Sequence, residues 1–337
     1  MISKLAYAVL AVFALFVAGA YLLPTTAHVE RSIEIERPVG SVFTVLDRFD
    51  AFPAWSPWFN RDPDIEYRFS GPASGVGARL EWNGDPRLVG TGWMEITESR
   101  PNSLVRSRLV LEFQGEAETA FSIERIAGGS RVNWTFDADL VAGQGWFGGL
   151  LSRYFGLFFD RWIGSDFETG LQGLKTWIET LPGADFSGLE AGLVEVEPVD
   201  VLHAESHGDL AAAYQAISSF MALNGIERAG QPIAVTRFGD KKNFQLSAEV
   251  PVLRTDAPAG GDVKWGTSPA GWAARAVHRG SYDALPATYE KLAAWMAAHG
   301  YSEGQLSWEH YISDPGDTAV DDLVTHVYFQ LDTPPRE

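Results

Sequence analysis

Hydrophobic and polar residues follow two different periods along this chain. Residues 29–35 and most of residues 65–140 alternate between apolar and polar positions, and turn residues such as Gly84-Asp85-Pro86 and Gly128-Gly129 interrupt the alternation. Alternation is the period of a strand that has one buried face. A short amphipathic helix is predicted between these two regions, from Val42 to Phe49. Many consecutive short strands of this kind predict an antiparallel sheet.

A long helix is predicted after Gly148-Gly149, ending at Leu181. Its apolar residues recur at steps of four and three, so one stripe faces a partner: Phe167, Leu171, Leu174, Ile178 and Leu181. A strand, short helices, a curved sheet and a long C-terminal helix together describe a grip around a cavity. The candidates to line that cavity are Trp82, Trp93, Trp134 and Trp55. An ordinary aromatic core is the alternative for each of them.

Residues 203–226 and 278–301 align with each other without a gap. The identical pairs are His203/His278, Ser206/Ser281, Leu210/Leu285, Ala212/Ala287, Tyr214/Tyr289, Met221/Met296, Ala222/Ala297 and Gly225/Gly300. This agreement is higher than chance gives, so the last third of the chain is predicted to be one domain built from two similar modules. Each module reads as strand, helix, strand, strand. Two such modules side by side would leave a cleft between them.

The second module contains the strand candidate Trp308-Glu309-His310-Tyr311-Ile312. Because side chains alternate between the faces of a strand, Glu309 and Tyr311 share one face and Trp308 lies on the other. A carboxylate beside a phenol, on a surface that faces a cleft, is a candidate ligand site. A solvated strand glutamate is the alternative.

Other polar residues match between the two modules. We expect His278 and His203 to make local hydrogen bonds at a strand end. Tyr289 and Tyr214 lie at helical spacing among apolar neighbours, so we expect them to contribute to packing.

The N-terminal segment is apolar. Leu5 to Leu23 carries no charge, and a run near 20 residues is the length that crosses a hydrocarbon core of roughly 30 Å. We therefore predict that residues 1–24 are a membrane anchor, with Lys4 on the cytoplasmic side and the remaining chain on the periplasmic side of a bacterial inner membrane. A cleaved signal peptide is the alternative, since Ala18-Gly19-Ala20 fits a cleavage pattern, and it predicts the same compartment.

Composition narrows the choice of partners. The chain has 337 residues, enough for two cores. Its net charge of −18 disfavours nucleic acid, whose phosphates require a basic patch. We expect a small hydrophobic or cationic molecule as the partner and no nucleic acid. The chain has no cysteine, which excludes disulfides, zinc–thiolate sites and thiol nucleophiles.

The usual motifs of cofactor and metal chemistry do not occur in the sequence. Gly75-Val76-Gly77-Ala78 begins like a dinucleotide loop but lacks the third glycine and a βαβ context. The sequence has no Walker loop, no His-Glu-x-x-His and no Gly-x-Ser-x-Gly. Its histidines show no paired ligand spacing. We therefore expect no cofactor and no metal site, and we assign no catalytic residue.

The segments Trp55-Ser56-Pro57-Trp58, Gly90-Thr91-Gly92 and Pro101-Asn102, with the helix from Asp166 to Lys175, resemble the SRPBCC superfamily, also called START/polyketide-cyclase. The resemblance covers residues 28–182. It implies a helix-grip fold with a hydrophobic tunnel. It implies no particular reaction, because members of the superfamily include binders, transfer proteins and a minority of enzymes.

After an expected linker over 183–192, residues 193–332 are similar to the GyrI-like effector-binding domain. The similarity lies in His278-Arg279-Gly280-Ser281-Tyr282, Leu285-Pro286-Ala287-Thr288-Tyr289 and Trp308-Glu309-His310-Tyr311. It implies that Glu309 contacts ligands, frequently cationic and aromatic ones, with Tyr311 and Tyr282 as walls. The candidate ligand-binding residues are therefore Glu309, Tyr311, Tyr282, Trp308 and His278.

Regulators of the GyrI-like family join this domain to a helix-turn-helix, and no segment of this chain resembles one. We therefore predict a membrane-tethered, α+β small-molecule binding protein. One alternative is a cavity enzyme, either cyclase-like or hydrolase-like, with Glu309 as its acid or base. Another alternative is a scaffold for partner proteins, which predicts large exposed apolar patches and filled cavities.

Overall fold

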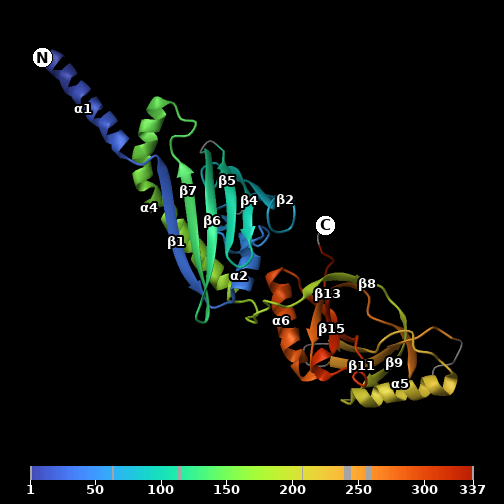
Figure 1. Cartoon of the computed structure of the whole chain (residues 1–337). Coiled ribbons are helices and arrows are strands. Elements are labelled where there is room, and N and C mark those ends of the chain that lie inside the picture. The colour runs from blue at the N-terminus through green and yellow to red at the C-terminus, as the bar shows by residue number, and fades with distance from the viewer. Residues whose placement is uncertain are drawn as a thin grey trace. The chain divides into compact units, whose positions relative to one another are not determined.

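The computed structural model of the chain describes residues 2–62, 64–112, 115–206, 208–238, 244–255 and 260–335. It divides into two compact units, Met1–Gly183 and Ala184–Glu337. Each unit contains one antiparallel sheet with helices (Figure 1). The predicted α+β class, with two antiparallel sheets and a long helix that ends the first unit, is confirmed.

The sheet of the first unit has the strand order β1-β7-β6-β5-β4-β3-β2. From β2 to β7 each strand pairs with its neighbour in sequence, and β1 pairs with β7 along its whole length, from Thr26↔Asp139 to Ile35↔Ser130. The result is the meander that the alternating pattern predicts. Its strands are β1 (Thr26–Ile35), β2 (Glu66–Ser70), β3 (Arg79–Asn83), β4 (Thr91–Arg100), β5 (Leu104–Leu111), β6 (Gly115–Ile126) and β7 (Gly129–Asp139).

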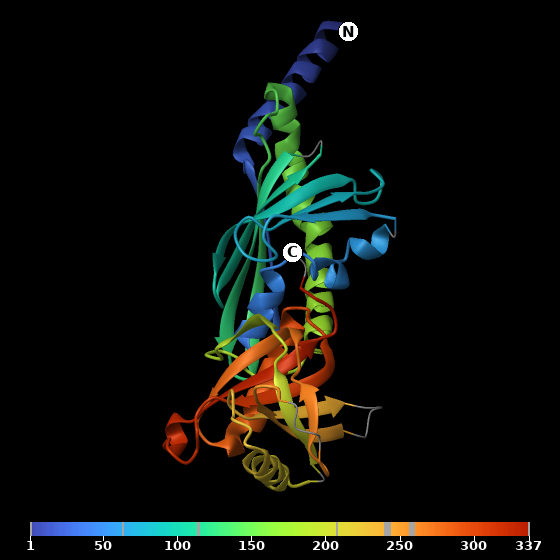
Figure 2. The ribbon, with the colours of Figure 1, turned by 90° about the vertical axis from the view of Figure 1, so that its right-hand side faces the viewer.

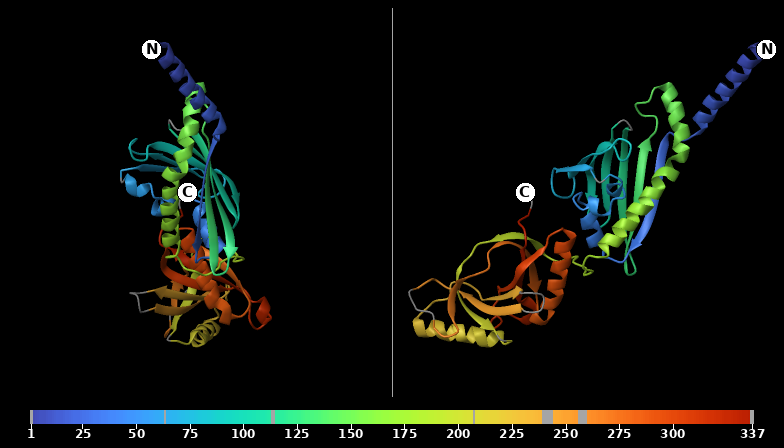
Figure 3. Two further views of the ribbon diagram at one scale, coloured as in Figure 1. Left: turned by 90° about the vertical axis from the view of Figure 1, so that its left-hand side faces the viewer. Right: turned by 180° about the vertical axis from the view of Figure 1, so that it is seen from behind.

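Helix α4 (Trp146–Ile178) lies along one face of this sheet (Figure 3). The short elements α2 (Val39–Leu46), α3 (Phe52–Trp55) and η1 (Phe59–Arg61) lie beside its second half (Figure 2). The predicted apolar stripe of α4 faces the core, where Phe167, Leu171, Leu174 and Ile178 are buried.

The apolar N-terminal run forms helix α1 (Ile2–Leu22), which contacts the first half of α4. The ring of Phe16 stacks on that of Tyr154, with centroids 4.8 Å apart, and the Tyr154 hydroxyl donates to the Phe16 carbonyl. Arg153 donates to the carbonyls of Ala20 and Leu23. No helix among the described residues is long and apolar enough to cross a membrane. The membrane-spanning assignment of residues 1–24 is therefore not shown.

The sheet of the second unit has the order β12-β9-β11-β10-β14-β15-β13-β8. The expected linker, 183–192, contains the boundary between the units, and β8 already begins at Ala191. The strands are β8 (Ala191–Val196), β9 (Asp200–Ser206), β10 (Ile233–Phe238), β11 (Phe244–Pro251), β12 (Lys264–Thr267), β13 (Gly271–Arg279), β14 (Glu303–Tyr311) and β15 (Val324–Leu331).

The order strand, helix, strand, strand occurs twice in this unit, as β9-α5-β10-β11 and β13-α6-β14-β15. Helix α5 (Leu210–Asn224) packs on β9 and β11, and α6 (Leu285–Ala298) packs on β13. Strands β10 and β14 pair with each other in the middle of the sheet, where Ala234 lies opposite Glu309. The central strands therefore lie between the two strand sets that the helices cover.

Candidate functional site

The first unit encloses a cavity of about 250 Å³. Most of its walls are apolar side chains from the sheet, from α4 and from the short helices between β1 and β2. They include Leu46, Phe49, Phe52, Trp55, Trp58, Ile65, Tyr67, Trp82, Met94, Val105, Leu109, Phe121, Trp134, Phe136, Ile163 and Phe167. A largely apolar concavity with few polar groups is the usual form of a site for a small organic ligand.

The central wall of the cavity is Trp134, from β7. Its ring stacks on that of Phe167, with centroids 3.8 Å apart, and its indole Nε1 donates to the Thr119 hydroxyl at 2.8 Å. Two glycines let α4 approach this closely. A Cβ on Gly170 would lie 2.8 Å from the Trp134 ring, and one on Gly173 would lie 2.6 Å from the carbonyl oxygen of Trp55. The helix–sheet contact that shapes the cavity therefore depends on small residues in α4.

Few polar groups reach the cavity. Arg61 donates to Asp166 at 3.0 Å, and both residues line the wall. Burial, together with the charge of Asp62, raises the pKa of Tyr67 to about 12, so its phenol stays protonated at neutral pH. Ser107 on β5 and Thr119 on β6 add small hydroxyl-bearing side chains, and Arg48 also lines the wall. An apolar ligand fits these walls, with one ion pair at the side.

Three of the four tryptophans predicted to line the cavity do so: Trp55, Trp82 and Trp134. Trp93 does not line this cavity. It follows Gly92 and precedes the cavity residue Met94 on β4, so alternation turns its ring to the other face of the sheet. There the guanidinium of Arg79 lies 3.9 Å from the centre of its ring.

In the second unit, Glu309 lies on β14 with two phenols bonded to its carboxylate. The Tyr311 hydroxyl donates to Oε2 at 2.6 Å, and the Tyr289 hydroxyl donates to Oε1 at 3.1 Å. Tyr311 comes from the same strand and Tyr289 from α6. Each carboxylate oxygen thus accepts one bond and retains a further lone pair. A half-buried carboxylate between aromatic rings offers a cation both a counter-charge and ring faces.

The phenols around Glu309 have raised pKa values. Burial, reinforced by the negative charge of Glu309, raises the pKa of Tyr289, Tyr311 and Tyr214. The Tyr214 hydroxyl, from α5, is buried and has no hydrogen-bond partner among the residues that the structure describes. At neutral pH these groups are neutral donors, so Glu309 supplies the negative charge of the cluster.

The other predicted site residues of this unit lie in different surroundings. The Tyr282 ring meets that of Tyr311 edge-on at 5.4 Å and so adds an aromatic wall. His278 is buried, and its two ring nitrogens contact the Thr288 hydroxyl and the Ser281 carbonyl. It therefore supports the turn that carries Tyr282, by the local bonds that the sequence predicts.

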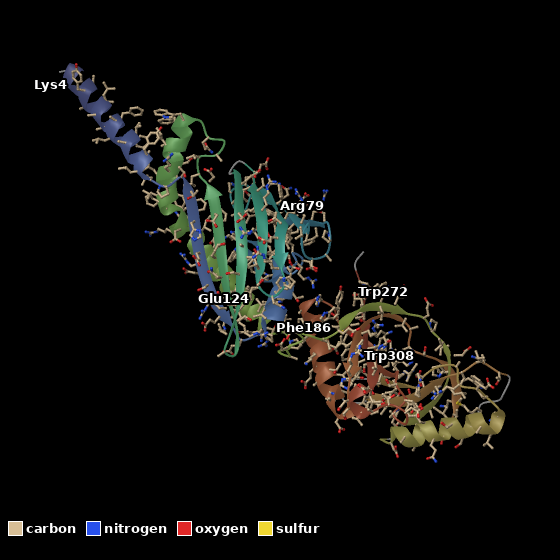
Figure 4. All side chains as sticks on the ribbon, viewed as in Figure 1. Lys4, Arg79, Glu124, Phe186, Trp272 and Trp308 are labelled. Carbon is tan, nitrogen blue, oxygen red and sulfur yellow. The ribbon has the colours of Figure 1, made fainter. Side chains whose placement is uncertain are left out.

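Trp308 is also separated from Glu309. It is buried on the opposite face of β14, where its ring stacks on Tyr328 at 4.8 Å (Figure 4). The alternation of the strand predicts this separation, so Trp308 contributes to packing and does not contact the Glu309 carboxylate.

Sequence reasoning missed Tyr289 and Tyr214, which were expected only to pack. The signal that identifies them is the repeat itself. Both helices carry a tyrosine at the same position of the module, and the two modules meet at β10 and β14. A residue that matches in both copies and faces the sheet is therefore brought towards the same central strands from both sides.

The described residues contain no group of three or more His, Cys, Asp or Glu that could hold a metal ion. The first arrangement offers an apolar surface, and the second offers a carboxylate beside aromatic rings.

Two family models match the chain, in the order that the sequence predicts. The model described as polyketide cyclase / dehydrase and lipid transport matches residues 26–179, and that of the GyrI-like small molecule binding domain matches residues 202–332. The predicted succession of an SRPBCC-like and a GyrI-like domain is therefore confirmed. Both are small-molecule binding domains. No curated protein matches the chain.

Several solved structures are similar at low identity. EcmrR in its complex with DNA is 20% identical over 42% of this chain, with a TM-score of 0.37, and the match spans 57% of the EcmrR chain. A hydrolase from Listeria innocua is 12% identical over 42% of this chain and 91% of its own, with a TM-score of 0.34. Ara h 8.0201 is 10% identical over 46% of this chain and 99% of its own, with a TM-score of 0.34. Similarities this low assign no function to this chain.

Proposed function

We propose that this chain, which joins a polyketide cyclase-like domain to a GyrI-like small molecule binding domain, is a two-site binding protein for small molecules. The observation that carries the proposal is the aromatic cavity of the first unit. An unfilled apolar cavity in a packed core lowers stability, so we take its presence as support for a bound ligand. The second site is the carboxylate of Glu309 among its tyrosines.

The size of the first cavity limits its ligand. Its volume of about 250 Å³ lies between the roughly 150 Å³ of a cavity that binds benzene and the lower end, about 300 Å³, of pockets for drug-sized molecules. A molecule with two fused rings or a short acyl chain fits this range. The ion pair of Arg61 and Asp166 at the wall favours a ligand with one polar end.

A cavity-filling substitution tests the first site. Ser107 is buried and lines the cavity from β5, so Ser107→Phe places a ring in the space that the ligand would occupy. We expect binding of 1-naphthol, measured by calorimetry, to weaken at least tenfold, or about 1.4 kcal/mol. Val110→Phe, on the same strand but outside the cavity, is the matched control. Equal affinities of wild type and Ser107→Phe would remove the cavity from the proposal.

A charge-neutral substitution tests the second site. Glu309→Gln keeps the shape of the side chain and removes the counter-charge of a bound cation. We expect affinity for tetraphenylphosphonium, a lipophilic aromatic cation, to fall by roughly tenfold or more. Glu205→Gln removes the same charge from an exposed position of the same unit and should leave the affinity unchanged. If both variants weaken binding alike, the effect is one of net charge and the assigned site is wrong.

We further propose that the chain is tethered to the inner membrane, with both units on the periplasmic side. The support for this tether is the absence of charge from Leu5 to Leu23 and the exposure of the large side chains of α1. The test is carbonate extraction of membranes, together with labelling of Glu124→Cys in intact cells by a thiol reagent that does not cross the inner membrane. Full release by carbonate, or no labelling until cells are lysed, would refute the tether or its orientation respectively.

A further inference from the structure

The first half of α4 exposes a row of large apolar side chains. Counting along the helix, they recur at steps of four, four, three and four, which places them on a single narrow stripe: Phe147, Leu151, Phe155, Phe158 and Trp162. Each is between 38% and 58% exposed. The stripe is about 22 Å long at 1.5 Å per residue. We refer to these five residues as the α4 stripe.

Other positions of this half of α4 are covered. Leu150 is buried, Tyr154 stacks on Phe16 of α1, and the ring of Phe159 packs against Phe136 in the core. Trp146 and Leu157, which lie beside the stripe, are exposed as well, so the uncovered apolar surface of α4 is wider than the stripe itself. Soluble domains rarely expose a contiguous apolar surface of this kind without a partner.

The charge distribution around the stripe distinguishes it from the remaining surface. Residues 140–159 contain one charged side chain, Arg153, and no acid, although the whole chain carries a net charge of −18. Helix α1, which contacts this half of α4, has Lys4 as its one charged residue. Asp160, near the end of the stripe, is the first acid of α4, and its carboxylate is paired with Arg31. Helix α1 and residues 140–159 thus form a region without acids, which anionic lipids would not repel.

We infer that the α4 stripe is a docking surface for the lipid bilayer, in addition to the α1 anchor. The inference rests on the proposed tether for the presence of α1 in the same membrane. Phenylalanine and leucine side chains enter the boundary between headgroups and acyl chains, while tryptophan prefers the interface itself. Trp162 therefore marks the depth at which α4 leaves the bilayer.

This assignment has a consequence for the cavity. Directly after Trp162, α4 contributes Ile163 and Asp166 to the cavity wall. With the stripe in the bilayer surface, the helix that lines the cavity is held against the lipid phase. Apolar ligands, which concentrate in the bilayer, would then have the shortest path to the cavity.

A second copy of this chain is the competing occupant. A dimer would bury the stripe against an identical stripe and leave the neighbouring apolar face of α1 uncovered. A bilayer covers both faces at once, because they belong to adjacent helices. The continuity of the stripe with α1 and the lack of acids in α1 and in residues 140–159 favour the bilayer.

Because the chain has no cysteine, single cysteines report on each face separately. The full chain is reconstituted in vesicles of phosphatidylcholine and phosphatidylglycerol and labelled with an NBD fluorophore at Phe155→Cys, Phe158→Cys, Val12→Cys or Gln172→Cys. The last is exposed on the second half of α4, away from the stripe, and serves as the control. Val12→Cys reports on the α1 anchor alone.

We expect severalfold higher NBD emission at residues 155 and 158 than at 172, and quenching at those two positions by lipids that carry a nitroxide on the acyl chain. Lipid quenching at residue 12, with residues 155 and 158 as exposed to water as 172, would overturn the inference and leave the anchor intact. Stripe labels shielded from both lipid and water, with cross-linking between identical single-cysteine positions, would overturn it in favour of a second copy.

Discussion

The two candidate sites use opposite physical means. The cavity of the first unit is walled by stacked rings, and the indole of Trp134 donates to the Thr119 hydroxyl within that wall. The site of the second unit is a carboxylate, Glu309, held by phenol donors from two different elements. Shape and volume select the ligand in the first site. Charge and the direction of hydrogen bonds select it in the second.

This difference follows from how each unit is built. A meander with one long helix across it leaves a space wherever helix and sheet are held apart, and large side chains partly fill that space. A duplicated module brings equivalent residues to the junction of its two copies, so a polar position can be approached from both sides. The first site therefore depends on packing, and the second depends on a few directed contacts.

The largest expected effect concerns packing in the first unit. Trp134 is buried and contacts the rings of Phe167 and Phe121, so Trp134→Ala removes the central wall of the cavity. We expect the free energy of unfolding of the first unit to fall by about 3–5 kcal/mol. Amide hydrogen exchange in β6 and β7, followed by mass spectrometry, resolves this unit from the second.

The matched control for this prediction is Trp93→Ala, in the same sheet but on its outer face. There the substitution removes the contacts of the ring with the guanidinium groups of Arg79 and Arg108, each worth about 1 kcal/mol or less. Similar losses of unfolding free energy for the two variants would show that the cavity wall contributes no more to stability than the outer face does. That result would contradict the idea that the first site depends on packing.

The sequence predicted the first unit well because its hydrophobic residues recur with the regular spacings of strands and helices. Alternation located the strands, and the spacing of Phe167, Leu171, Leu174 and Ile178 located the buried face of α4. The position of Trp93 outside the cavity has the same origin. Alternation also decides which face a residue takes, but only after the register is known, and Gly92 and Met94 fix that register only in the structure.

For the second unit the repeat predicted the modules, and the identity of Glu309 came from a family pattern. What the sequence did not reveal was the pair of partners. Tyr289 is distant from Glu309 along the chain, and nothing in local spacing indicates that its hydroxyl reaches Oε1. This long-range contact depends on how α6 packs on the sheet, and the sequence of no single segment determines that packing.

A smaller effect is expected from removing the phenols of the second site. Tyr311→Phe deletes the 2.6 Å bond to Glu309, and Tyr289→Phe deletes the 3.1 Å bond. Because a hydrogen bond to a charged group is worth roughly 1.5–3 kcal/mol, we expect the second unit to lose stability in this range for Tyr311→Phe and less for Tyr289→Phe. Urea unfolding followed by hydrogen exchange in β14 measures both.

Tyr328→Phe is the control for the tyrosine series, because its hydroxyl lies on the other face of the sheet, where it is 3.4 Å from His326 and also interacts with Arg275. Its loss of stability should be smaller than that of Tyr311→Phe. A loss at Tyr328 as large as at Tyr311 would contradict the idea that the second unit depends on a few directed contacts to Glu309.

The smallest effect is expected from Glu249, whose carboxylate lies on the opposite face of the second sheet from that of Glu309. Glu309 has both oxygens bonded, whereas Glu249 is 1% exposed and its Oε2 has no partner among the described residues. Arg237 donates to the other oxygen of Glu249 at 3.2 Å, Ser247 lies beside it, and His203 is its register partner on β9. Burial outweighs the charge of Arg237 and raises the pKa of Glu249.

The sign of the resulting pH dependence is fixed by that direction. The folded chain holds the Glu249 proton at a pH where the unfolded chain, with its ordinary value of 4.5, has released it. Stability therefore falls as pH rises from the ordinary value through the raised one. Glu249→Gln removes this slope, so its stability relative to wild type should increase between pH 4 and pH 8, while Glu205→Gln at an exposed position should show no such trend. A relative stability of Glu249→Gln that stays constant or declines with pH would mean that Arg237 compensates the buried charge fully, and the two carboxylates would then be equivalent.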